Sequence, residues 1–224
     1  YLTCPLDFYF RYVMDFGEED SVEEEIEHST FGTFIHDTLE ELYTPFARFD
    51  KEGNKNIPAP KNITSFDVEE MLKRYPLILE KQFMIHFNND KQAFTKGKNL
   101  LSYQMAMELT ERFLKSEVKF LSEQTEPVFI EALEREYVSA IEVTVNGEQK
   151  KVRLRGFIDR IDSIGDRVRI IDYKSGKCDA EKVSLSKPSK KNPDLNLENI
   201  TYHDKKGYAR QLLMYAIMFQ QQFP

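Results

Sequence analysis

The chain has 224 residues, of which 41% are hydrophobic and 31% are charged, and its formal net charge is −7 at pH 7. This length suits one α/β domain with a sizeable core, and this composition excludes a disordered chain. The net negative charge argues against a protein that coats nucleic acid through a broadly positive surface.

The sequence shows no signal for secretion or for a membrane. No apolar run approaches the roughly 18–20 residues that a membrane span needs. The two cysteines do not make a disulfide framework, so we expect an intracellular, cytoplasmic protein with no membrane contact. Because the chain enters a structured-looking segment directly at Tyr1, we expect one domain over residues 1–224 that is a piece of a longer protein.

Two helices are predicted in the N-terminal part. Pro5 favours the first turn of a short, aromatic-rich helix. A second helix is predicted from a cap at Ser29 or Thr30 to about Tyr43. His36 lies on this helix. A lone histidine there is more often structural than a ligand, so the helix alone leaves both roles open.

Four more helical or loop segments follow from local signals. Thr64 or Ser65 is expected to cap a helix that ends at Pro76, because proline removes a helical hydrogen bond. Residues 97–123 predict one long amphipathic helix laid across a sheet. Residues 175–206 are rich in Lys, Asn, Pro and Ser and predict a mobile lid or substrate-binding loop, and residues 207–222 predict a final helix.

Three β-strands are predicted over residues 131–145, 150–162 and 167–173. Asn146-Gly147 and Gly165-Asp166 separate them, and such pairs are signals for two-residue hairpin turns. The strands therefore form an antiparallel meander. With helices before and after it, the chain is expected to have an α/β (α+β) fold.

The second hairpin turn places two carboxylates opposite each other. Counting outward from it, Ile161 faces Ile170. Two residues further out, Asp159 faces Asp172, where Cα atoms lie roughly 4.5 Å apart and like charges repel unless compensated. Lys174 lies two residues beyond Asp172, on the same strand face. Two carboxylates would hold Mg²⁺, and the ammonium would lie near the attacking water or the developing phosphoryl charge.

The first hairpin turn supplies a weaker, third carboxylate. Counting from Asn146-Gly147, Glu134 approaches Asp159, provided that no β-bulge shifts the register.

A plainer interpretation of the same hairpin is an exposed sheet edge. In that case Arg155, Asp159, Arg160 and Asp162 would form solvent-facing salt bridges. The hairpin alone does not decide between this edge and a metal site.

Five short segments follow one another along the chain: CPLDFYFRYV, FGTFIH, GFIDRID, IIDYKSGK and QLLMY. They resemble motifs of the PD-(D/E)XK nuclease superfamily, in its RecB-like and AddB-like branch. The corresponding patterns are a Cys-Pro-aromatic segment, a G-x-x-x-H helix, a G-x-x-D-R-x-D and D-Y-K-x-G pair, and a Q-x-x-x-Y helix. The resemblance implies a restriction-endonuclease-like core, with a mixed central sheet flanked by helices.

The resemblance also implies roles for individual residues. Asp159 and Asp172 would be metal-binding carboxylates, His36 a further metal ligand, and the backbone carbonyl of Tyr173 would complete the protein's share of the coordination. Lys174 would orient the attacking water and stabilise the transition state.

Two residues of the last helix complete the implied catalytic set. Gln211 and Tyr215 would support the site or contact the nucleic acid strand. The implied activity is a Mg²⁺- or Mn²⁺-dependent deoxyribonuclease, acting as an exonuclease rather than an endonuclease.

The resemblance extends to cellular context. It implies single-stranded DNA as substrate during end processing in recombination or repair, with a helicase region or a partner subunit nearby. Alternatives are a non-catalytic DNA-binding or scaffolding module that keeps the nuclease fold, and a CRISPR-associated RecB-like exonuclease, which the missing downstream cysteines disfavour.

An iron–sulfur cluster, which several relatives carry, is not expected within these residues. Cys4 matches the first cluster position, but Cys178 falls in the wrong place, and two cysteines cannot supply four ligands. Either the other cluster cysteines lie beyond these residues in a longer protein, or the cluster is absent and Cys4 is buried, and the second alternative is favoured.

Overall fold

The computed structural model describes residues 4–14, 26–49, 54–55, 61–178, 180–183 and 206–222. Its elements, in chain order, are α1 (Pro5–Phe8), η1 (Tyr9–Val13), α2 (His28–Tyr43), η2 (Thr44–Phe46), β1 (Ala47–Phe49), α3 (Ser65–His86), η3 (Lys91–Phe94), α4 (Gly97–Ser122), β2 (Val128–Val145), β3 (Glu148–Ile164), β4 (Arg167–Ile171), α5 (Ala180–Val183) and α7 (Gly207–Gln222). None of the helices in this described part is long and apolar enough to cross a membrane.

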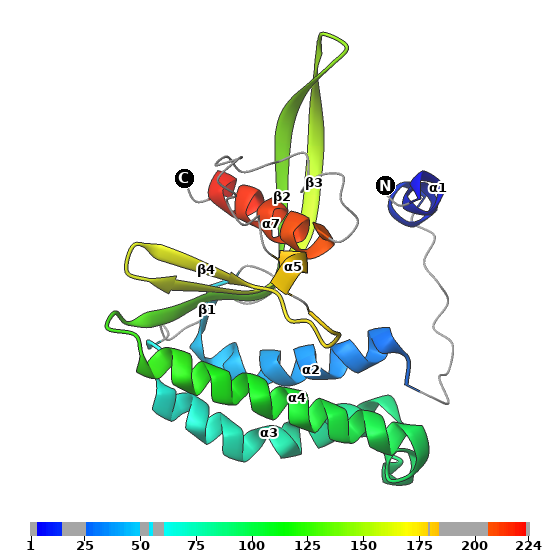
Figure 1. Ribbon diagram of the computed structural model, residues 1–224, viewed down its shortest axis with the longest axis vertical. Helices are drawn as coiled ribbons and strands as arrows, with labels where there is room; N and C mark the ends of the chain where they lie inside the picture. The colour runs from blue at the N-terminus through cyan, green and yellow to red at the C-terminus, as the bar shows by residue number, and fades with distance from the viewer. Residues whose placement is uncertain are drawn as a thin grey trace.

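The centre of the fold is a mixed sheet in the order β1-β2-β3-β4 (Figure 1). The antiparallel pairs β2–β3 and β3–β4 form the predicted meander, and the predicted fold class is confirmed. Strand β1 was not predicted. Its three residues are too few for a periodic pattern, and they gain strand geometry by pairing in parallel with β2, where Ala47 lies beside Ile130.

The register of the meander follows the two predicted turns. Ile161 pairs with Ile170, as counted from the second turn, and β4 ends at Ile171, one residue before Asp172. In β2–β3, the pairs Leu133–Arg160 and Arg135–Ile158 bracket Glu134 and Asp159, so these two carboxylates oppose each other. The one register shift in this ladder lies between Ile130 and Ala132. This shift lies beyond Glu134 when residues are counted from the Asn146-Gly147 turn, so it does not change the predicted opposition of Glu134 and Asp159.

Helices α2, α3 and α4 form one layer against the sheet (Figure 1). Its core includes the fully buried Leu79 and Leu114 and a close ring pair between Phe34 and Phe83, with centroids 4.1 Å apart. Helix α7 packs instead on the β2–β3 ribbon. There a smaller second cluster forms from Tyr137, Ile158, Ile161, Tyr215 and Met218. The catalytic candidates lie between these two cores.

Helix α3 departs from the prediction at Pro76. The helix was expected to end there, but it continues from Ser65 to His86 with Pro76 inside. The missing amide of Pro76 removes one helical hydrogen bond. The neighbouring turns bury Tyr75, Ile78 and Leu79, and this packing outweighs the loss. The predicted cap is correct, because the Thr64 side chain accepts from the Asp67 amide.

Other local expectations were less accurate. Helix α2 begins at His28, so Ser29 and Thr30 lie in its first turn rather than at its cap. Cys4 is exposed, contrary to the expectation that it is buried. Of the predicted lid, only residues 175–178, 180–183 and 206 are described, and the rest of that prediction lies outside the described residues.

Candidate active site

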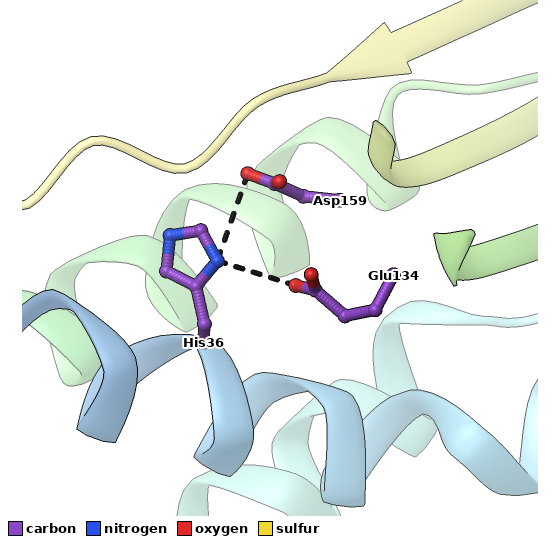
Figure 2. Close-up of side chains that lie close together, drawn as sticks. All are labelled: His36, Glu134 and Asp159. Atoms are coloured by element: carbon purple, nitrogen blue, oxygen red, sulfur yellow. Dashed lines mark hydrogen bonds and ion pairs between the residues drawn. The ribbon is translucent and has the colours of Figure 1, made fainter. Parts of the chain in front are cut away.

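A histidine and two carboxylates meet where α2 faces the β2–β3 ribbon (Figure 2). His36 Nδ1 lies 3.2 Å from Glu134 Oε1 and 3.8 Å from Asp159 Oδ2. One ligand atom from each of the three residues lies within 4.8 Å of the other two. Imidazole nitrogen and carboxylate oxygens are ligands of divalent cations, so this cluster has the composition of a metal site.

The peptide of Tyr173 fixes the orientation of this cluster. Its amide donates to Asp159 Oδ2 at 2.5 Å, and its carbonyl lies 3.2 Å from His36 Nε2. A carbonyl can only accept, so Nε2 carries the hydrogen. In the neutral ring the Nδ1 lone pair then points toward Glu134 and Asp159. A hydrogen bond on the far nitrogen is the usual way in which proteins orient a metal-binding imidazole.

This geometry bears on the predicted metal role of the Tyr173 carbonyl. The carbonyl lies against Nε2, whereas the carboxylates face Nδ1. In this arrangement the carbonyl holds the imidazole, and its role as a metal ligand stays a prediction.

Electrostatics in the cluster favour a cation. Burial raises the pKa of Asp159 to about 6, and the negative charges of Glu134 and Asp172 add to this, against the lowering effects of His36 and the Tyr173 amide. For His36, burial opposes protonation. The hydrogen bond with Glu134 and the charge of Asp159 outweigh it, so the pKa of His36 is raised. The negative charges of these neighbouring carboxylates disfavour one another's ionisation. A divalent cation would offset them, so the residues fit a metal.

Asp172 and Lys174 form an ion pair beside the cluster. Asp172 follows the last residue of β4, and Lys174 Nζ lies 2.6 Å from Asp172 Oδ2. The side chain of Asp172 is 8% exposed and that of Lys174 is 29% exposed, so the pair can be reached from solvent. Asp172 therefore lies near the cluster, and its carboxylate is paired with Lys174.

Two cavities meet at His36. One, of about 170 Å³, is lined by His36, Asp172, Tyr173 and Lys174 together with apolar side chains such as Phe113. The other, of about 340 Å³, is lined by Ser29, Gly32, Thr33, His36, Asp37 and Glu134. The candidate metal cluster is thus accessible from both the Lys174 side and the Glu134 side.

Helix α7 brings the last two predicted residues toward the carboxylates. Gln211 Nε2 donates to the Tyr215 hydroxyl at 2.7 Å. Burial raises the pKa of Tyr215 to about 12, and the charges of Asp172, Asp159 and Glu134 contribute. Tyr215 can come this close to β3 because of Gly156, where a Cβ would lie 3.1 Å from Tyr215 Cε1.

The exposed-edge interpretation of the hairpin is wrong. Arg160 and Asp162 are fully buried, and Asp159 is nearly so. Arg160 Nε lies 2.7 Å from Asp162 Oδ1, and its Nη1 lies 3.0 Å from Glu117 Oε2 of α4. Sequence reasoning missed this network, because an acidic residue in a long amphipathic helix gives no signal of burial. Glu134, in contrast, could be placed opposite Asp159 by counting residues from the Asn146-Gly147 turn.

Comparison with known proteins adds an independent result. The sequence model of the PD-(D/E)XK nuclease superfamily matches residues 1–224, the entire chain. The searches of curated proteins and of solved structures gave no match. With a restriction-endonuclease-like mixed sheet and a cluster suited to a divalent metal, the chain belongs to the PD-(D/E)XK nuclease superfamily, which implies a metal-dependent nuclease.

Proposed function

We propose that this chain is a Mg²⁺- or Mn²⁺-dependent deoxyribonuclease that shortens single-stranded DNA from an end, during end processing in recombination or repair. The observation that carries the proposal is the cluster of His36, Glu134 and Asp159 beside the Asp172–Lys174 pair. The RecB-like and AddB-like motifs support the finer parts, namely DNA as substrate, exonuclease action, and a helicase region or partner subunit. A cytoplasmic setting is supported by the cysteine content, which is too low for a disulfide framework.

The protein's own groups have separable tasks. His36, Glu134 and Asp159 would hold the ion, and Asp172 would join them once its carboxylate turns from Lys174. A bound divalent cation supplies charge neutralisation at the phosphate and activation of the attacking water. Burial excludes bulk water from Asp159 and strengthens each of these interactions.

Lys174 is the cation that we assign to the scissile phosphate. Its ammonium is partly exposed at the wall of the cavity that His36 also lines. From there it orients the attacking water and stabilises the negative charge that develops on the phosphate oxygens. Gln211 and Tyr215 support the site from α7: Tyr215 packs against Ile158 and Ile161 of β3, and the Gln211 amide donates to its hydroxyl and orients it.

Single-stranded DNA as substrate rests on the RecB-like and AddB-like motifs. The two cavities at His36, of about 170 and 340 Å³, give a strand access to the cluster. The test is cleavage of labelled single-stranded, double-stranded and circular DNA and of RNA, with Mg²⁺, Mn²⁺ or EDTA. We expect metal-dependent mononucleotide or short products from linear single strands, and none from circles. Cutting of circles would refute the exonuclease assignment.

A Lys174→Ala variant separates chemistry from binding. It removes the ammonium but none of the three clustered ligands, so metal and DNA binding should persist while cleavage falls by at least about a hundredfold. If wild-type protein binds metal and DNA and cuts no substrate under any metal, the chain is a non-catalytic binding module and the proposal fails.

A further inference from the structure

The outer part of the β2–β3 ribbon, residues 138–155, rises away from the layer formed by α2, α3 and α4 (Figure 1). A free two-stranded ribbon is marginally stable in water, since it has little core of its own. The metal cluster does not need this extension, because Glu134 and Asp159 lie at its base. Because the ribbon extends away from the helical layer, it offers a surface for contact with another molecule.

The ribbon is locally basic in an acidic protein. Residues 138–155 carry four basic and two acidic side chains, in a chain whose net charge is −7. The basic residues fall on β3, in the run KKVRLR at residues 150–155.

The strand period sorts these side chains onto one face. Alternate residues of a strand point to the same side. One face of β3 therefore carries a row of exposed side chains, which we call the cationic row: Lys151, Arg153, Arg155 and Phe157. Phe157 is 50% exposed, which is unusual for a phenylalanine in a strand so close to the core.

The neighbours on β2 leave Arg153 uncovered, whereas Lys151 and Arg155 have acidic neighbours. Arg153 lies opposite Ala140 and Arg155 opposite Val138, which are small apolar residues. Arg155 is ion-paired with Glu136, and Lys151 has Glu142 across the ladder. Arg153 has no ion-pair partner within the described ranges, so its charge is available to a ligand.

The row leads directly to the candidate active site. Phe157 precedes Asp159 by two residues on β3. At about 3.3 Å per residue, Phe157 lies about 7 Å along the strand from Asp159, Arg153 about 20 Å and Lys151 about 26 Å. The aromatic side chain is thus nearest to the metal cluster and the cations lie further out.

We propose that the cationic row binds the single DNA strand on one side of the scissile phosphate, with a base stacked on Phe157 and phosphates on Arg153 and Lys151. Exposed aromatic side chains and cations spaced along a track are how proteins hold single strands without sequence preference. This inference rests on the proposed nuclease function. It favours nucleic acid over a protein partner, because the row is continuous with the cluster that would cut the strand.

The test is DNA binding by the full 224-residue chain in EDTA, where no cleavage occurs. The probes are fluorescein-labelled oligo-dT strands of about 4 and about 16 nucleotides, titrated by anisotropy between about 50 and 200 mM salt. The row variant carries Lys151→Glu and Arg153→Glu. The matched control carries Lys119→Glu and Arg167→Glu, which make the same charge change at exposed positions away from the ribbon.

We expect the row variant to lose about tenfold or more in affinity for the long strand at low salt, and its logarithmic salt slope to fall by about 1.4, for two lost phosphate contacts. The control should keep the wild-type slope, and all three proteins should bind the short strand alike. Phe157→Ala should weaken long-strand binding by roughly tenfold with an unchanged slope.

An unchanged salt slope in the row variant, or an equal loss of DNA affinity in the row variant and the control, overturns the inference. The ribbon would then be a contact surface for a protein partner. Cleavage of the short strand with Mn²⁺ is measured in parallel. If wild-type protein cuts it and the row variant binds DNA as the control does, the row inference alone fails. If wild-type protein never cuts, the proposed function fails, and the binding comparison still decides the row.

Discussion

Asp159→Asn should make the metal-free protein more stable at pH 7 while it abolishes cleavage. Burial raises the pKa of Asp159 from 3.8 to about 6, so its ionisation destabilises the native state by up to about 3 kcal/mol. This pKa already includes the attraction of His36 and the hydrogen bond from the Tyr173 amide, and the asparagine can still accept from that amide. Because asparagine stands in for the uncharged acid, we expect a gain of up to about 3 kcal/mol at pH 7.

The sign of this effect depends on pH. Below pH 3.8 Asp159 is protonated in both the folded and the unfolded chain, and the wild type bears no penalty. As pH rises through the window from 3.8 to about 6, the unfolded chain releases the proton first, so wild-type stability falls. The advantage of the variant should therefore appear across this window and stay constant above it.

Urea unfolding in EDTA at several pH values measures the gain, which corresponds to about 2–4 °C in Tm per kcal/mol. Divalent metal at about 100 times its Kd should then add about 2.7 kcal/mol to the wild type and far less to the variant. Asp166→Asn, in the exposed second turn, is the control. Equal stability of wild type and Asp159→Asn at pH 7, or a gain that does not change with pH, would refute this reasoning.

Three further predictions concern the scaffold. Arg160→Met removes the fully buried cation of this network and leaves the buried carboxylates of Glu117 and Asp162 with Arg169 alone, so it should lower the free energy of unfolding by about 3 kcal/mol in a urea titration. Pro76→Ala restores a hydrogen bond inside α3 and should raise the free energy of unfolding by about 1–3 kcal/mol. A lower free energy of unfolding would instead show that the proline geometry is needed. Gly156→Ala places a Cβ 3.1 Å from Tyr215 Cε1, so it should displace α7 and lower kcat by roughly ten- to a hundredfold in cleavage assays. Unchanged kcat would show that α7 does not support the site.

Turn chemistry made the site's sheet predictable. The dipeptides Asn146-Gly147 and Gly165-Asp166 set two registers, and from them followed the opposition of Glu134 to Asp159. Both signals are local, and a two-residue turn leaves little freedom in the pairing. The position of His36 relative to these strands could not be counted in this way. It depends on how α2 packs on the sheet, and only the family resemblance suggested it.

Tertiary packing decided the features that the sequence did not predict. The local sequence at Pro76 predicts a helix end, but buried side chains on both sides of it keep α3 continuous. Glu117 looks like a surface acid of α4, yet it lies beneath the site against Arg160. Each of these depends on partners far away in the sequence, which neither propensity nor periodicity can identify.

The most direct test of the central claim compares wild-type protein with Asp172→Ala on end-labelled single-stranded DNA, with Mg²⁺, Mn²⁺ or EDTA. Asp166→Ala, which removes a carboxylate from the exposed turn of the same hairpin, is the matched control. The account predicts metal-dependent cleavage by wild type and Asp166→Ala, and its loss in Asp172→Ala. Full cleavage by Asp172→Ala would contradict it, because the chemistry would then lie elsewhere than beside His36, Asp159 and Lys174.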